Sequence, residues 1–161
     1  MPGSADPPVP RATAPDQPRE HTLRVPSELG RLVAVRAFLR AAADEVGAGD
    51  ACTADLVQAV DEAATNAIIH GHAGRPGWVE VDVATDGDRF IVTLQDDAPE
   101  FDPTGVPTPD LLVHPGARRP GGMGVLLARL CVDEMTYRPR PGGGNILTLV
   151  RRFERNGKED R

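Results

Sequence analysis

Residues 54–70 carry apolar side chains at helical spacing, and the rest of the chain is organised around this segment. At about 100° per residue, one arc of the predicted helix contains Leu56, Val57, Val60, Ala63, Ala64, Ala67 and Ile68. Glu62, Asn66 and His70 are spaced four residues apart, so they form a line on the other side. This line of polar side chains is either an ordinary solvent-exposed face or one wall of a binding site.

An earlier segment shows a strand pattern followed by a second helical pattern. Alternating apolar residues at 21–25 predict a short strand. We expect Ser27 to cap a helix that extends to about Val46 and ends at Gly47. The apolar side of this helix comprises Leu29, Leu32, Val33, Val35, Phe38 and Leu39.

Alternation of apolar and polar residues predicts two β-hairpins in the second half of the chain. Residues 78–84 and 90–94 form the first, joined by the turn sequence Asp-Gly-Asp at 86–88. Residues 134–138 and 146–153 form the second, joined by a glycine-rich turn. Together with the helices, these strands predict a two-layer α+β fold, a sandwich in which helices cover one face of a mixed, mostly antiparallel sheet.

The segment between the two hairpins contains a proline-rich loop and a short helix. Residues 104–120 contain four prolines and little periodicity, which predicts a long loop. Gly-Gly-Met-Gly at 121–124 follows the loop and opens an apolar helix at 125–131. Because long loops inside compact domains are often lids, we treat this loop as a candidate lid.

The length of 161 residues predicts one domain with a substantial core, which we place at residues 21–153. Residues 1–20 include six prolines and almost no residue that could be buried, so they are expected to form a disordered tail. Residues 154–161 are mostly charged and are expected to form a second, frayed tail.

Charge and composition argue against several classes of function. The net charge of −6 and the lack of a basic cluster argue against nucleic acid as a direct partner. No apolar run approaches the roughly 18 residues of a membrane helix and no signal peptide is recognisable, so we expect a soluble cytoplasmic protein. Cys52 and Cys131 do not form a Cys-x-x-Cys pair, which favours buried reduced thiols over a disulfide or a metal site.

Three motifs follow one another along the chain: the polar line on the helix at 54–70, Asp-Asp-Ala at 96–98 after an apolar strand, and the glycine-rich segment at 121–124. In this order they resemble the N, G1 and G2 boxes of the GHKL ATP-binding fold, also called the histidine-kinase-like ATPase fold. More closely, residues 20–153 are similar to the anti-sigma-factor serine/threonine kinases of bacterial partner-switching systems. Each motif alone has little specificity, whereas three in order, with matching elements between them, indicate the family.

The resemblance implies that Asp96 accepts a hydrogen bond from the adenine amino group of ATP, although an Asp after a strand also commonly starts a turn. Ala98 occupies the position of the glycine in the family's Asp-x-Gly motif. Its methyl group and its preference for negative φ predict weaker or slightly reoriented nucleotide binding. Asn145 matches, loosely, a position where many family members carry a Thr beside the adenine pocket.

The other two motifs are implied to bind magnesium and phosphate. Asn66 matches the residue that supplies the only protein side chain on Mg²⁺ in the family, and a neutral amide oxygen suits an ion that keeps most of its waters. Glu62, one helical turn earlier, is placed to act as a general base. Gly122, Met123 and Gly124 match the family's G-x-G, whose N–H groups bind phosphate at a helix N-terminus.

Two interpretations stay open for three further residues. His70 could contact phosphate or the lid, but a single His at a helix end is more often structural. Arg118 and Arg119 could reach the terminal phosphates or could simply be surface charges.

The resemblance implies a kinase that also captures a protein. In the family, ATP is used to phosphorylate a Ser or Thr of a small anti-sigma-antagonist domain of the STAS type, a sigma factor or another regulator is sequestered, and the protein forms a homodimer. The alternative is an ATP-binding module that captures partners without phosphotransfer: Glu62 favours the enzyme, and Ala98 keeps the alternative open. The catalytic half of a histidine kinase is disfavoured, because no helix pair with a phospho-accepting His precedes the domain, and a gyrase- or chaperone-like ATPase would need transducer domains.

Overall fold

The computed structural model describes residues 21–108, 110, 112 and 122–155. Its five strands lie close to the predicted positions. They are β1 (His21–Pro26), β2 (Trp78–Asp86), β3 (Arg89–Asp96), β4 (Glu134–Pro139) and β5 (Asn145–Arg152). They form one sheet in the order β1-β2-β3-β5-β4, in which every pairing between described strands is antiparallel.

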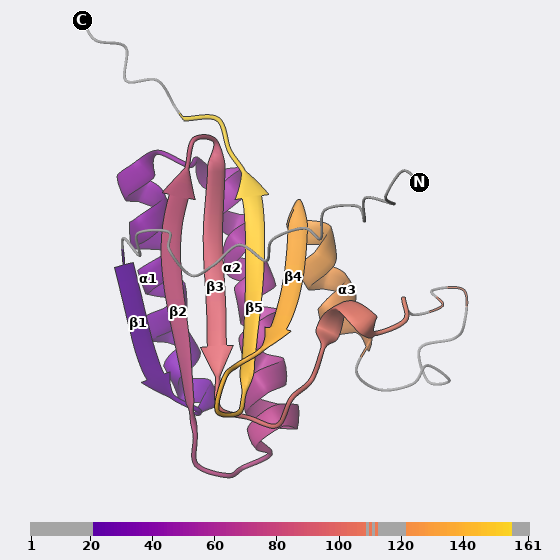
Figure 1. Ribbon diagram of the computed structural model, residues 1–161. Helices are drawn as coiled ribbons and strands as arrows, with labels where there is room; N and C mark the ends of the chain where they lie inside the picture. Colours follow the sequence, from indigo (N-terminus) through magenta and orange to yellow (C-terminus); the bar gives the residue numbers. More distant parts are fainter. Residues whose placement is uncertain (1–20, 109, 111, 113–121, 156–161) are drawn as a thin grey trace, which may run out of the picture.

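The helices lie against one face of this sheet (Figure 1). They are α1 (Leu32–Val46), α2 (Asp50–Asn66) and α3 (Gly122–Cys131). The shorter helical segments are the 3-10 turns η1 (Leu29–Arg31) and η3 (Pro103–Gly105) and the π-helix η2 (Ala67–His72). In the view of Figure 1, α1 and α2 lie behind the sheet and α3 lies beside β4. The predicted two-layer α+β fold is confirmed.

The core lies between the sheet and α2. The inward-facing side chains of β2 and β3 are buried there against the apolar side of the helix: Val79, Val81, Val83, Phe90, Val92 and Leu94 from the strands, and Leu56, Val60 and Ala64 from α2. Full burial of one such aliphatic side chain contributes roughly 1.5–3 kcal/mol, so this contact fixes the rotation of α2 about its axis. The polar side of α2 is thereby directed towards α3.

The helix after β1 begins differently from the prediction. Ser27 does not cap it, because the chain first makes the 3-10 turn η1 and the Ser27 hydroxyl contacts His72 instead. Leu29 and Val33, which we assigned to the apolar side, are 51% and 67% exposed. The end of the helix is as predicted, since Gly47 adopts a left-handed conformation with φ of 69°. The buried residues of α1 are Leu32, Val35, Leu39, Ala42 and Ala43.

The predicted motif helix changes type directly after Asn66, where the π-helix begins. A π turn is wider than an α turn and is frequently found at functional sites. The wider turn shifts the phase of the following residues, and His70 is exposed while His72 is buried. The predicted line of polar side chains therefore holds for Glu62 and Asn66, whereas the direction of His70 follows from the π-helix.

Several predictions fall outside the described residues. These are the tail at 1–20, residues 156–161 of the second tail, and most of the predicted loop, including Arg118 and Arg119. They stay predictions. Among the helices that the structure describes, none is long and apolar enough to cross a membrane.

Both cysteines are free thiols. Cys52 is buried and Cys131 is half-buried, and burial raises the pKa of each thiol. A raised pKa keeps a thiol protonated and unreactive, so both cysteines act as small apolar residues of the core.

Candidate functional site

A cavity of about 920 Å³ opens between α2, the loop after β3, and α3. Four of the predicted site residues line it: Asn66, Asp96, Ala98 and Gly122. His70 and Asn145 line it as well. Most of the remaining wall is apolar and includes Ala63, Ala67, Leu94, Val125, Met135 and Leu147. A concave site of this size, with apolar walls and a few polar groups, is typical of small-molecule binding.

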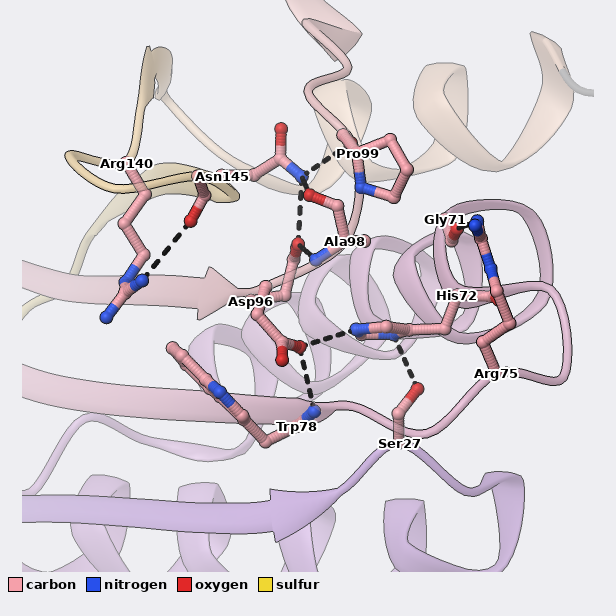
Figure 2. Close-up of polar contacts among 12 residues, drawn as sticks. Ser27, Gly71, His72, Arg75, Trp78, Asp96, Ala98, Pro99, Arg140 and Asn145 are labelled. Carbon is pink, nitrogen blue, oxygen red and sulfur yellow. Dashed lines mark hydrogen bonds and ion pairs between the residues drawn. The ribbon is translucent and has the colours of Figure 1, made fainter.

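Asp96 ends β3 and is only 5% exposed. Its Oδ1 atom accepts two hydrogen bonds, from the Ala98 N–H at 2.9 Å and from Nδ2 of Asn145 at 2.8 Å (Figure 2). Burial raises the pKa of the Asp96 carboxyl, and the two hydrogen bonds partly offset this rise. Oδ2 accepts no hydrogen bond from the described residues, so it is available to a ligand in the cavity.

Asn145 lies opposite Asp96 in the pairing of β3 with β5 and is 8% exposed. Its Oδ1 accepts from the Phe101 N–H at 2.8 Å and from the Tyr137 hydroxyl at 2.9 Å. Its Nδ2 donates to Asp96 and, at 3.1 Å, to the Pro99 carbonyl (Figure 2). Asn145 thus connects two strands to the loop that follows β3, a role that the loose sequence match did not indicate.

Ala98 fits its position without a glycine. It has negative φ, since Ala73 is the only described non-glycine residue with positive φ. Its side chain is 2% exposed and faces Gly71, where an added Cβ would lie 2.8 Å from the Ala98 methyl group. The methyl group is therefore accommodated by a glycine on the π-helix, and the turn needs no glycine of its own. The expected effect on nucleotide affinity stays a prediction.

His72 is a residue that the sequence did not single out. It is 4% exposed and lies between two side chains, with Nδ1 at 2.6 Å from Ser27 Oγ and Nε2 at 2.7 Å from Asp97 Oδ1. Asp97 also accepts from the Trp78 N–H at 2.9 Å. Partial burial raises the pKa of the Asp97 carboxyl, but the hydrogen bonds from Trp78 and His72 outweigh this effect, and the pKa is lowered. Asp97 is thereby held away from the cavity that Asp96 lines, and Gly77 leaves room for the imidazole ring.

Glu62 and Asn66 meet α3 at Gly124. An added Cβ at Gly124 would lie 2.8 Å from Oε2 of Glu62 and 3.8 Å from both side-chain heteroatoms of Asn66. Gln58 donates to Oε1 of Glu62 at 3.0 Å. The structure therefore brings together the three predicted residues, and a side chain at Gly124 would displace the Glu62 carboxylate from its position. Glu62 and Gly124 lie beside the cavity, not among the residues that line it.

The glycine-rich segment opens α3 at Gly122, which is earlier than the predicted helix start at 125. Gly122 lines the cavity, whereas Met123 is 39% exposed and does not. The N-terminus of a helix has free N–H groups and a favourable dipole for anions. Gly122 is therefore placed where the sequence predicted phosphate contacts, and no such placement is found for the Met123 side chain.

Arg129 of α3 fixes the first part of the loop after β3. Its guanidinium group donates to the carbonyls of Pro103 at 2.7 Å, Thr104 at 2.8 Å and Val106 at 3.1 Å. Pro103 and Val106 line the cavity. Arg129 therefore joins the loop that lines one side of the cavity to α3, whose first residue, Gly122, also lines the cavity. This contact is visible only in the three-dimensional structure.

With this geometry in place, the comparison with known families is decisive. Residues 25–151 match the model of the histidine kinase-like ATPase domain. The chain belongs to that family. The resemblance found from the motifs is thereby confirmed, and membership implies a protein that uses ATP.

Two individual relatives carry the same name. Two proteins named anti-sigma F factor, from Thermoanaerobacter sp. strain X514 and from Thermoanaerobacter pseudethanolicus, are each 24% identical to the chain over 98 residues. Each match covers 61% of this chain and 68% of the relative. The chain is therefore similar to proteins named as anti-sigma factors, at an identity below a third.

A solved structure is similar to most of the chain. The crystal structure of the RsbU and RsbW domains of Rv1364c from Mycobacterium tuberculosis matches 84% of this chain with a TM-score of 0.59 and 25% identity. The chain spans about a third of that longer protein, 32% of its length.

Proposed function

We propose that the chain is an ATP-dependent protein serine/threonine kinase and anti-sigma factor. It phosphorylates a Ser or Thr of a small STAS-type anti-sigma antagonist and sequesters a sigma factor, acting as a homodimer. The observation that carries this proposal is that Asp96 and Asn66 line one cavity, with Glu62 one helical turn from Asn66. The names of the similar proteins support the anti-sigma part of the proposal.

The buried end of the cavity fits adenine. Asp96 presents a carboxylate oxygen to which none of the described residues donates, and the exocyclic amino group of adenine is a donor. Leu94, Met135 and Leu147 supply apolar wall in the same cavity, which suits the faces of a purine ring. The residues present therefore fit the base.

The other end fits a triphosphate with magnesium. Among the described residues, no group of three or more His, Cys, Asp and Glu side chains is arranged to hold a metal. An ion bound there would be held by the Asn66 amide oxygen, phosphate oxygens and water, which is the type of coordination that Mg²⁺ prefers. Bound magnesium would supply neutralisation of phosphate charge. Gly122 and Gly124 keep Cβ atoms out of this region.

Glu62 is proposed to accept the proton of the attacking Ser or Thr hydroxyl. Its carboxylate lies beside Asn66 at Gly124 and is only half-buried, so a partner's hydroxyl can approach it. General bases typically contribute about 10²–10⁴-fold to rate. Its hydrogen bond from Gln58 orients the carboxylate and leaves Oε2 free of any described donor.

A second candidate is an ATP-binding module that captures partners without phosphotransfer. The observation that favours it is that Glu62 lies beside the cavity and does not line it. Under this hypothesis the carboxylate only packs against α3.

The two candidates are separated by one incubation. The purified chain is mixed with labelled ATP, magnesium and each small STAS-type domain encoded nearby, and phosphoserine and phosphothreonine are measured on each domain. The kinase proposal predicts label on one of them, and much slower labelling with Glu62→Gln. A chain that binds ATP and the antagonist domain but transfers no phosphate to any of them would establish the second candidate.

A further inference from the structure

The Asn145 side chain makes several hydrogen bonds around Asp96 in addition to the backbone pairing of its strand. It comes from the first position of β5, faces Asp96 across the β3–β5 pairing, and also contacts Phe101, Tyr137 and Pro99. Both heteroatoms of its amide are engaged, and the residue is 8% exposed. A buried and fully satisfied polar group of this kind restricts the orientation of its partners.

The orientation of the Asn145 amide follows from its partners. The Phe101 N–H can only donate, so the Asn145 atom that it contacts has to be the oxygen. The Asn145 nitrogen therefore faces Asp96 and donates to Oδ1. The Ala98 N–H donates to the same oxygen. Two obligate donors thus require an acceptor at this one position of residue 96.

We propose that Asn145 is a positioning residue that sets which purine the cavity accepts. By demanding an acceptor at Oδ1 of Asp96, it leaves the other oxygen as the atom that meets the base, and this oxygen selects a 6-amino purine over a 6-keto purine. The inference rests on the proposed nucleotide-binding function of the cavity.

The protonation state of Asp96 enters the same selection. Charged or titratable groups near it are Asp97 and His72 on one side and Tyr137 from β4 on the other. Burial raises the pKa of Asp96 and is the largest effect on it. The hydrogen bond from Asn145 is the next largest effect and lowers the pKa. A proton bound to Asp96 resides on Oδ2, since Oδ1 already receives two donors, and it would oppose an amino group. ATP affinity should therefore fall as pH decreases through the raised pKa.

The first test is the purine preference of Asp96→Asn, measured as dissociation constants for ATP and ITP, which differ at position 6 of the purine. The donors from Asn145 and Ala98 have to meet the new amide oxygen, so the new NH₂ group points into the cavity. The parent is expected to bind ATP more tightly than ITP. In the variant, the ratio of the two dissociation constants should shift in favour of ITP by at least about tenfold.

Gln95→Met is the matched control. Gln95 is a buried amide in β3 that donates to Asp82 at 3.0 Å, and its side chain points to the opposite face of the sheet from that of Leu94. Removing this amide tests whether loss of any buried hydrogen bond near Asp96 changes the preference. We expect the ratio of the ATP and ITP dissociation constants in this variant to equal that of the parent.

The second test, Asn145→Asp, changes charge while keeping the acceptor for Phe101 and Tyr137. Two carboxylates would then face each other and share one proton. Loss of that proton as pH rises would create repulsion, so ATP affinity should fall by about tenfold or more between about pH 6 and about pH 8. The parent should show no such loss, because it has only one carboxyl at this place, and ionisation of Asp96 as pH rises favours the amino group of adenine.

Two results would overturn the inference: an unchanged ATP preference in Asp96→Asn, or a pH profile of Asn145→Asp that matches the parent. If Asp96→Asn fails to fold, the pH profile of Asn145→Asp decides alone. A parent protein that binds neither nucleotide refutes the proposed function, and the inference with it, which distinguishes that failure from a failure of Asn145 alone.

Discussion

At the proposed base end of the cavity, formed by Asp96 and Asn145, both side chains are less than a tenth exposed and are joined by hydrogen bonds to Ala98, Phe101 and other partners. At the proposed phosphate end, which Asn66 lines and which Glu62 and Gly124 adjoin, both polar side chains are half-buried. Glu62 there receives one side-chain hydrogen bond, from Gln58, among the described residues. The same cavity therefore has a buried end whose side chains are held by several hydrogen bonds, and a more exposed end whose side chains make fewer.

This difference separates recognition from chemistry. A satisfied, buried network keeps its geometry before a ligand arrives, so it can discriminate between bases. Groups that have to meet phosphate, metal and an incoming protein need free atoms and access. Substitutions at the base end should therefore change which nucleotide binds, and substitutions at the phosphate end should change what happens to it.

The largest effect is expected for Asn66→Ala. Loss of the amide oxygen removes the proposed side-chain ligand of magnesium, and a metal contributes several kcal/mol of charge stabilisation to phosphoryl transfer. Phosphorylation of the antagonist domain should fall by about 10³-fold or more. Circular dichroism and thermal unfolding check that the fold is retained. Transfer at the parent rate would show that Asn66 is not a magnesium ligand.

Glu62→Gln should give the next largest effect. Glutamine keeps the size of the side chain but cannot accept the hydroxyl proton, so single-turnover transfer should slow by about 10²–10⁴-fold. Binding of ATP and of the antagonist domain should stay close to that of the parent. If transfer proceeds at the parent rate, the chain has another base.

Gly124→Ala tests the close approach of α2 and α3. The new methyl group would lie 2.8 Å from Oε2 of Glu62, so the carboxylate has to move. A displacement of this size at a reacting group can cost about 10²-fold in rate. Gly105→Ala is a matched control, because an added Cβ there has no heavy atom within 4 Å. Equal transfer rates for the two variants would show that Glu62 need not stay at its position.

Ala98→Gly should have the smallest effect on function. The Ala98 methyl group is buried against Gly71, and its loss together with the added freedom of glycine should lower the free energy of unfolding by about 1–2 kcal/mol. The Asp96 network does not use the methyl group, so the predicted tightening of ATP binding should be modest, with a dissociation constant lowered by less than about threefold. A much larger change in ATP affinity, in either direction, would show that the methyl group touches the base.

Much of the phosphate end could be predicted from the sequence. Glu62 and Asn66 are one helical turn apart, so helical spacing alone places them side by side, and the glycines at 122 and 124 start the following helix. Asp96 could be placed at a strand end by alternation in β3. Local periodicity is enough for each of these residues.

The supporting contacts could not be predicted, because they join residues that are distant in the sequence. His72 contacts Ser27, 45 residues earlier, and Asp97, 25 residues later. Helix capping assigned Ser27 to a different partner, because that rule uses neighbouring residues only. The role of Asn145 depends on the register of β5 against β3, and strand patterns alone leave that register open.

The most direct test of the division into a base end and a phosphate end uses calorimetric titration. Adenosine and Mg-ATP are each titrated into the parent and into Asn66→Ala. Adenosine meets only the base end, so its dissociation constant should be the same for both proteins. Mg-ATP should bind the parent more tightly than adenosine does, and most of that advantage should be lost in Asn66→Ala. An equal loss of adenosine and Mg-ATP affinity, or unchanged Mg-ATP binding in Asn66→Ala, would contradict the division of the cavity into a base end and a phosphate end.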